Sequence, residues 1–188
     1  MKIVGLCGRA GAGKSSVVAI VKQRFPNVQA ISTGDATRRL LRSQGIGISH
    51  HNLQAITKQI LADRGDDFIS FIFDLVDPQY EITLFDSFRR VQDVACVTKT
   101  FGAPVIVGVS APEELRFKRL QARSRPSDPP NQVAFNELTM LENSWGVEDV
   151  CRLAEAHIVN TGSYTELCEQ AMIILKEIFQ SQIGSTYV

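Results

Sequence analysis

The feature that most constrains this chain is the pattern G-x-x-x-x-G-K-[ST], which runs from Gly8 to Ser15. An apolar run at residues 3–7 precedes the pattern, and an amphipathic stretch at 14–25 follows it. Small residues in a strand-to-helix turn let backbone N–H groups converge on phosphate oxygens at a helix N-terminus, where the helix dipole favours negative charge. In this context the pattern predicts a loop that binds nucleotide phosphates, rather than a glycine-rich turn with an incidental lysine.

The loop and the first helical turn supply the expected nucleotide contacts. Lys14 brings a mobile positive charge to the β- and γ-phosphates, the Ser15 hydroxyl is suited to Mg²⁺, and Ser16 is expected at the α-phosphate. The full set of expected contacts is Gly8, Arg9, Ala10, Gly11, Ala12, Gly13, Lys14, Ser15 and Ser16. This pattern alone does not distinguish a kinase from an ATPase or a switch GTPase.

Short apolar runs alternate with longer amphipathic stretches along the chain. Strands are predicted at 3–7, 28–31, 82–85, 105–109 and 157–159. Helices are predicted at 14–25, 36–43, 52–63, 67–76, 91–101, 112–123, 133–144, 147–154 and 165–179. Strands separated by helices require crossover connections, so the pattern indicates an α/β fold with a parallel sheet covered on both faces.

Composition bounds the class of protein. The chain has 188 residues, 44% hydrophobic and 21% charged, which predicts a single globular domain over residues 1–188. Its formal net charge is zero, so the chain lacks the overall positive charge with which a protein binds nucleic acid or an anionic membrane mainly by electrostatics. Four scattered cysteines without a CxxC pair are read as small buried hydrophobes in a reducing compartment. We therefore expect a cytoplasmic monomer or homodimer without a nucleic-acid or membrane partner.

Polar residues follow two of the predicted strands. Thr33, Asp35 and Arg38 come directly after the second strand, and Asp86 and Arg89 come directly after the third. Since the carboxyl ends of parallel strands gather at one edge, these residues are expected beside the phosphate loop. An acid directly after an apolar strand is the Walker B arrangement, so Asp86 is the expected metal residue together with Ser15. The alternatives are that both acids only cap helices and that Arg38 is solvated.

Basic residues cluster after the fourth strand, before a Pro-rich segment. Arg119, Arg123 and Arg125 are expected on a lid at about 119–131 that closes over nucleotide phosphates. Arg116 and Lys118 are read instead as a solvated helix face. A second irregular region, the mostly helical stretch at about 36–78, is expected to be an insertion on the acceptor side.

These residues together resemble the P-loop nucleoside and nucleotide kinase superfamily, in particular the adenylate-kinase-related and dephospho-CoA-kinase-like proteins. The segments that carry the resemblance are the phosphate loop, 31–38, 86–89, 119–129, 142–147 and 156–163. The resemblance implies a three-layer fold with strand order 2-3-1-4-5. It also implies that Thr33 and Arg38 contact the acceptor nucleotide and that Asn160 lies by the adenine of ATP. Ser87 stands where the related proteins have Gly, and the turn before Arg89 is one residue shorter than in true adenylate kinases.

The predicted activity is ATP-dependent transfer of a γ-phosphoryl group, with Mg²⁺, to a nucleotide or nucleotide-like acceptor of the NMP, dNMP or dephospho-CoA type. Lys14, Asp35, Arg123 and Arg125 are the expected catalytic residues, and Thr33, Asp35, Arg38 and Arg89 the acceptor contacts. Arg119 and Asn160 join the loop as nucleotide contacts. The alternatives are a P-loop ATPase or nucleotide-dependent switch with a protein partner, and a non-catalytic nucleotide sensor. The guanine-reading pattern Asn-Lys-x-Asp does not occur at a suitable position.

Overall fold

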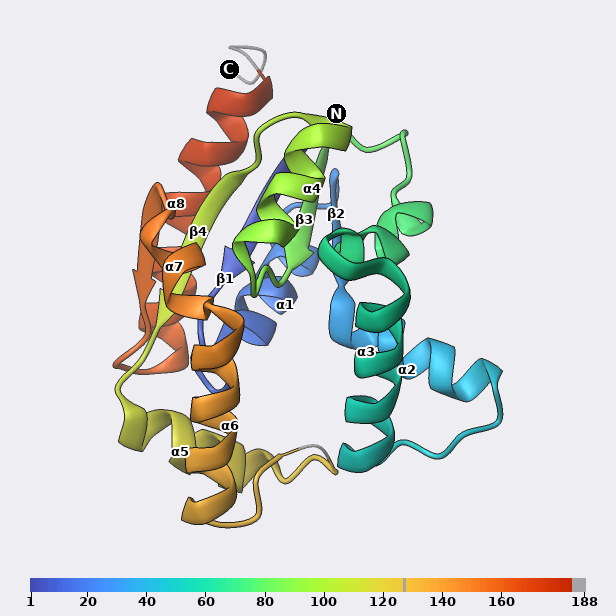
Figure 1. Cartoon of the computed structure of the whole chain (residues 1–188). Coiled ribbons are helices and arrows are strands. Elements are labelled where there is room, and N and C mark those ends of the chain that lie inside the picture. The colour runs from blue at the N-terminus through green and yellow to red at the C-terminus, as the bar shows by residue number, and fades with distance from the viewer. Residues whose placement is uncertain (127, 184–188) are drawn as a thin grey trace.

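The computed structural model describes residues 1–126 and 128–183. Its centre is a parallel sheet of five strands in the order β2-β3-β1-β4-β5 (Figure 1). The bounds are β1 Lys2–Cys7, β2 Val28–Ser32, β3 Ile82–Asp86, β4 Val105–Ser110 and β5 Ala156–Val159. The predicted α/β fold and its strand order are confirmed.

Helices cover both faces of the sheet. On one face α1 (Lys14–Arg24) and α8 (Tyr164–Ile183) enclose a core cluster that includes Leu6 and Leu84. On the other face lie α4 (Val91–Phe101), α7 (Val147–Arg152) and the 3₁₀ helix η1 (Gly65–Leu75), which pack around Phe85 and Phe88. Because β1 and β3 are buried on both sides, almost every residue in them is apolar, as central parallel strands require.

The chain between β2 and β3 forms α2 (Thr33–Ser43), α3 (His50–Arg64) and η1. Together α2 and α3 stand beyond the carboxyl edge of the sheet (Figure 1) and share a small core of Leu41, Ile56 and Ile60. The helix predicted at 67–76 is a 3₁₀ helix instead of an α-helix. Its buried Ile69 and Ile72 are three residues apart, the spacing at which side chains align along a 3₁₀ helix.

After β4, α5 (Glu113–Arg123) and α6 (Gln132–Trp145) form a hairpin on the same side of the sheet as the phosphate loop (Figure 1). The expected lid, at about 119–131, covers the end of α5 and the segment that joins it to α6; Ser127 in it lies outside the described residues. Gly146, in the left-handed conformation at φ 79°, ends α6 and lets the chain turn directly into α7. In residues 1–126 and 128–183, no helix is long and apolar enough to cross a membrane.

Candidate active site

The register of the sheet brings the polar ends of three strands together. Leu6 of β1 pairs with Asp86 of β3, and Asp86 also pairs with Ser32 of β2. The phosphate loop leaves β1 one residue beyond Cys7, and α2 starts at Thr33. The Thr33 hydroxyl donates to the Asp86 carbonyl oxygen at 3.3 Å, so the ends of β2 and β3 are tied to each other.

Lys14 folds back over the loop. Its Nζ donates to the Gly8 carbonyl at 2.6 Å and to the Arg9 carbonyl at 3.1 Å. Burial lowers the pKa of Lys14, and the negative charge of Asp86 opposes that shift. The ammonium thus makes these two hydrogen bonds to carbonyls of the loop itself.

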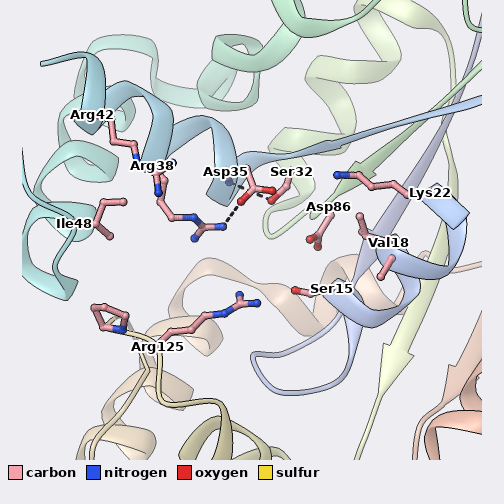
Figure 2. Close-up of a pocket in the computed structure, with 12 residues that line it drawn as sticks. Ser15, Val18, Lys22, Ser32, Asp35, Arg38, Arg42, Ile48, Asp86 and Arg125 are labelled. Atoms are coloured by element: carbon pink, nitrogen blue, oxygen red, sulfur yellow. Dashed lines mark hydrogen bonds and ion pairs between the residues drawn. The ribbon is translucent and has the colours of Figure 1, made fainter.

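Among the carboxylates, Asp86 has the largest effect on the pKa of Lys14. Burial raises the pKa of Asp86, while the positive charges of Lys14 and Arg89 lower it. Asp86 and Ser15 line the same pocket and point into it in Figure 2. A carboxylate and a hydroxyl are the hard oxygen ligands that Mg²⁺ takes from protein when phosphates and water supply the rest. The residues present therefore fit Mg²⁺ bound together with a nucleotide.

The pocket beside the loop has a volume of about 580 Å³. Its walls come from α1, the end of β2, α2, the end of β3, the loop after α2, and the loop after α5 (Figure 2). The residues that line it are Ser15, Val18, Ala19, Lys22, Ser32, Asp35, Arg38, Arg42, Ile48, Asp86, Arg125 and Pro126. It brings together Ser15, Asp35, Arg38, Asp86 and Arg125 of the predicted site.

Sequence reasoning missed Lys22 and Arg42 in this pocket, although helical spacing could have found both. Arg42 lies four residues after Arg38 on α2, which places the two on one helix face. Likewise Lys22 lies seven residues after Ser15 on α1, with Val18 between them. In both cases a residue at helical spacing from a predicted site residue lines the same wall of the pocket.

Asp35 and Arg38 form an ion pair at 2.5 Å across one turn of α2. The helix cap is Ser32, whose Oγ accepts the Asp35 backbone N–H at 3.2 Å. Asp35 is therefore not the capping residue, which removes one alternative for this acid. Its carboxylate is exposed at the pocket and pairs with Arg38.

Asp128 organises the segment between α5 and α6, where the lid is predicted. Its carboxylate accepts from Arg123 Nε at 2.9 Å and from the Arg125 backbone N–H at 3.0 Å. Although burial opposes the shift, these hydrogen bonds hold the pKa of Asp128 below its usual value. Arg123 is consequently bound to Asp128 and does not line the pocket, whereas the Arg125 side chain extends into it (Figure 2).

Arg119 and Asn160 lie behind the loop. Arg119 donates to both the backbone and the side-chain oxygen of Asn160, each at 3.1 Å. The Asn160 amide in turn donates to the Ala12 carbonyl at 2.9 Å and is buried. Gly13 has no room for a side chain here, since a Cβ would lie 2.2 Å from Asn160 Nδ2. The pair thus supports the second half of the loop.

Arg89 stacks over the Trp145 ring, 5.1 Å from its centroid, and does not line the pocket. Its positive charge nevertheless lowers the pKa values of both Lys14 and Asp86.

The expectation that Arg116 is solvated is wrong. Arg116 is 5% exposed, lies over the Phe135 ring at 5.2 Å and donates to the Ala10 carbonyl at 3.3 Å. The reason is that α6 covers this face of α5, a contact between helices that the pattern of α5 alone does not reveal. Lys118 is exposed.

Comparison with known proteins extends over nearly the whole chain. The chain is 26% identical over 184 residues to a UPF0200/UPF0201 protein of Archaeoglobus fulgidus, and the match covers 95% of this chain and 56% of that protein. It is 28% identical over 178 residues to a UPF0200 protein of Hyperthermus butylicus, covering 94% of each. The chain thus spans about half of the first relative and nearly all of the second.

Among solved structures, shikimate kinase from Acinetobacter baumannii, in complex with shikimate, is similar with a TM-score of 0.60. The two are 14% identical, and the match covers 98% of this chain and 96% of the kinase. At this identity the likeness shows a common fold, that of the P-loop kinases. Residues 3–143, which include the phosphate loop, β3 and the lid, match the family model AAA_33, described as an AAA domain. The chain therefore belongs to this family of AAA domains and has the fold of the P-loop kinase superfamily.

Proposed function

We propose that this protein is an ATP-dependent phosphotransferase that moves the γ-phosphoryl group to a nucleotide or nucleotide-like acceptor of the NMP, dNMP or dephospho-CoA type. The observation that supports it most is the composition of the pocket. Ser15 and Asp86 line one part of it, and Arg38, Arg42 and Arg125 line another. A second, cation-lined ligand space that adjoins the metal residues is what transfer to an acceptor needs and what simple hydrolysis does not.

The nucleotide half of the site is assigned to the loop. Its backbone N–H groups and Lys14 bind the β- and γ-phosphates, with Arg119 and Asn160 completing the nucleotide contacts. Ser15 and Asp86 would hold Mg²⁺, which neutralises charge on the phosphates when bound. Lys14 leaves its loop carbonyls for the phosphate, so the positive charge reaches the ligand without a large movement of the backbone.

The acceptor half is assigned to α2, the end of β3 and the lid. Arg38, Arg42 and Lys22 face the acceptor, with Thr33 and Arg89 at its borders. Arg125, with Arg123 behind it, is assigned to the lid contact on the transferred group, since a planar guanidinium binds phosphate oxygens in pairs.

The transfer itself is an in-line displacement. An acceptor oxygen forms a bond to the γ-phosphorus, and the bond from that phosphorus to the oxygen bridging it to the β-phosphate breaks, leaving ADP with the electron pair. Where the acceptor is a hydroxyl, Asp35 accepts its proton, and Arg38 keeps the carboxylate oriented. Where the acceptor is already a phosphate oxygen, no proton has to move and Asp35 serves only to position the ligand.

The test mixes purified protein with Mg²⁺ and ATP labelled in the γ-phosphate, with one acceptor at a time. The acceptors are the NMPs, the dNMPs, dephospho-CoA and, as neutral controls, nucleosides. Label should reach a phosphate-bearing acceptor with the wild type but not with Lys14→Ala. Label that reaches none of them contradicts the proposal. Steady release of labelled phosphate without an acceptor would favour an ATPase instead.

A further inference from the structure

Ala10, in the first half of the phosphate loop, is held on both sides by buried charged side chains. Its backbone N–H donates to Glu142 Oε1 at 2.8 Å, and its carbonyl accepts from Arg116 Nη1 at 3.3 Å. Glu142 is 1% exposed and Arg116 is 5% exposed. Glu142 comes from α6 and Arg116 from α5, the two helices that the lid segment joins (Figure 1).

Burial of these two charges is poorly explained by stability alone. A buried ion network costs desolvation that well-packed apolar side chains avoid, so it is weak evidence for a stabilising role. Moreover the second carboxylate oxygen of Glu142, Oε2, is buried without a hydrogen-bond partner in the described part of the chain. A buried carboxylate oxygen without a hydrogen-bond partner, next to the phosphate loop, indicates that the residue has a functional role at that loop.

Glu142 is connected to Lys14 through a single peptide unit. The Arg9–Ala10 peptide presents its carbonyl to Lys14 Nζ at 3.1 Å and its N–H to Glu142 at 2.8 Å. Glu142 therefore fixes the plane of the peptide on which the lysine rests. Its negative charge also raises the pKa of Lys14, against the larger effect of burial.

The Arg9 side chain adds a second link to the same helices. It donates to the Thr139 carbonyl and to Asn143 on α6, and it pairs with Glu148 on α7. The first half of the loop is thus fastened to the helix that follows the lid, whereas its second half is fastened to Arg119 and Asn160.

We propose that Glu142 is a positioning residue for phosphate binding: with Arg116 it clamps Ala10, sets the Arg9–Ala10 peptide for Lys14 and couples the loop to the lid helices. This inference rests on the proposed function for its meaning, but the clamp is testable apart from it. The expected effect of losing it is a loop that still follows β1 but no longer presents Lys14 in a defined place.

The experiment compares wild type, Glu142→Gln and Glu142→Ala, with Glu137→Gln as the control, an exposed acid on the same helix. Affinity for Mg²⁺–ATP is measured by calorimetry at pH 7, at a temperature where all four are folded. Glu142→Ala should bind about tenfold or more weakly, because a buried N–H loses a charged acceptor. Glu142→Gln, which keeps an acceptor for Ala10, should restore most of that affinity at pH 7.

Rescue by the conservative variant separates positioning from mere structural support. Glu142→Gln keeps an oxygen that accepts the Ala10 N–H, whereas Glu142→Ala leaves that N–H without this partner. If Glu142 positions the loop peptide, Glu142→Gln should therefore bind Mg²⁺–ATP much more tightly than Glu142→Ala, and Glu137→Gln should bind like wild type. Glu142→Ala that binds as tightly as wild type, or Glu142→Gln that binds as weakly as Glu142→Ala, overturns the proposal.

Hydrogen exchange keeps the test independent of nucleotide binding. In Glu142→Ala the amides of the loop peptide at 8–14 should exchange several-fold faster than in wild type, with β3 and β4 unchanged. If wild type binds no ATP, the proposed function fails, yet this measurement still decides the clamp. Unchanged exchange of the loop peptide would then refute it.

Discussion

Replacement of Asn160 by Ala separates support of the loop from recognition of the base. Asn160 is 6% exposed, donates to the Ala12 carbonyl at 2.9 Å and accepts from Arg119 at 3.1 Å. The resemblance to dephospho-CoA kinases implies a second role for the same residue beside the adenine of ATP. The two roles predict different results for one substitution.

The size of the effect follows from the contacts that Ala cannot make. Loss of the amide leaves the Ala12 carbonyl without its partner in a buried place, which costs about 1–3 kcal/mol. Arg119 loses one of its two bonds but keeps the one to the Asn160 backbone and has access to water, so we add only about 0.5 kcal/mol. The sum is about 1.5–3.5 kcal/mol, which corresponds to a melting temperature lower by roughly 3–14 °C in a chain of this length.

The assay is urea unfolding followed by circular dichroism, with thermal unfolding beside it. Asn160→Ala should lower the midpoint without changing the slope, while Thr161→Ala, an exposed neighbour, should leave both unchanged. Asn160→Asp is the informative partner, because it keeps an acceptor for Arg119 but sets an oxygen against the Ala12 carbonyl. It should be no more stable than the Ala variant.

Nucleotide binding gives the second half of the test. If Asn160 mainly supports the loop, Asn160→Ala lowers the affinities for ATP and GTP by the same factor, because both nucleotides rely on the same phosphate contacts. If it mainly reads adenine, the ratio of the two affinities changes. An unfolding free energy within about 0.5 kcal/mol of wild type would refute the structural reasoning.

Three further substitutions test other parts of the fold and site. Burial raises the pKa of Asp86 above its ordinary 3.8, so the free energy of unfolding should fall as the pH rises from that value through the folded-state pKa. Asp86→Asn should abolish this fall, measured by urea unfolding between about pH 3.5 and 8. It should also weaken Mg²⁺-dependent ATP binding. Asp128→Asn removes the negative charge that pairs with Arg123 and should speed tryptic cleavage after Arg123 several-fold, whereas Asp149→Asn, in an exposed pair, should not. Gly5→Ala would set a Cβ 2.0 Å from the Phe88 ring and should cost about 1–3 kcal/mol in thermal unfolding, while Gly47→Ala, with open space around it, should cost far less.

The sheet and the loop were predictable because their signals are local. Each central strand is an apolar run, and the phosphate loop is a contiguous pattern with the right element on each side. The acids after β2 and β3 were predictable as neighbours for the same reason, since parallel strands end at one edge. The domain bounds, the helical insertion and the role of each site residue stay predictions.

The charged contacts of α5 and α6 were not predictable from either helix alone. Arg116 belongs to a run of basic residues and Glu142 to a polar stretch, and each reads as solvated by composition. Both are buried because α6 folds back across α5 and because the loop apex rises between them. Such contacts depend on the packing of three segments that are far apart in the sequence, and helical period carries no information about them.

In the described part of the chain, the predicted lid and the predicted insertion each bring one paired and one unpaired arginine to the surroundings of the pocket. Arg38 is neutralised by Asp35, and Arg123 by Asp128, yet within the described ranges neither Arg42 nor Arg125 takes part in an ion pair. Burial lowers the pKa of Arg125, and the positive charges of Arg123 and Arg38 lower it further, although Asp128 and Asp35 act in the opposite direction. Arg38 and Arg123 are therefore compensated by carboxylates of the chain itself. Arg42 and Arg125 leave positive charge on two walls of the pocket, and an anion between these walls would be attracted to both of them.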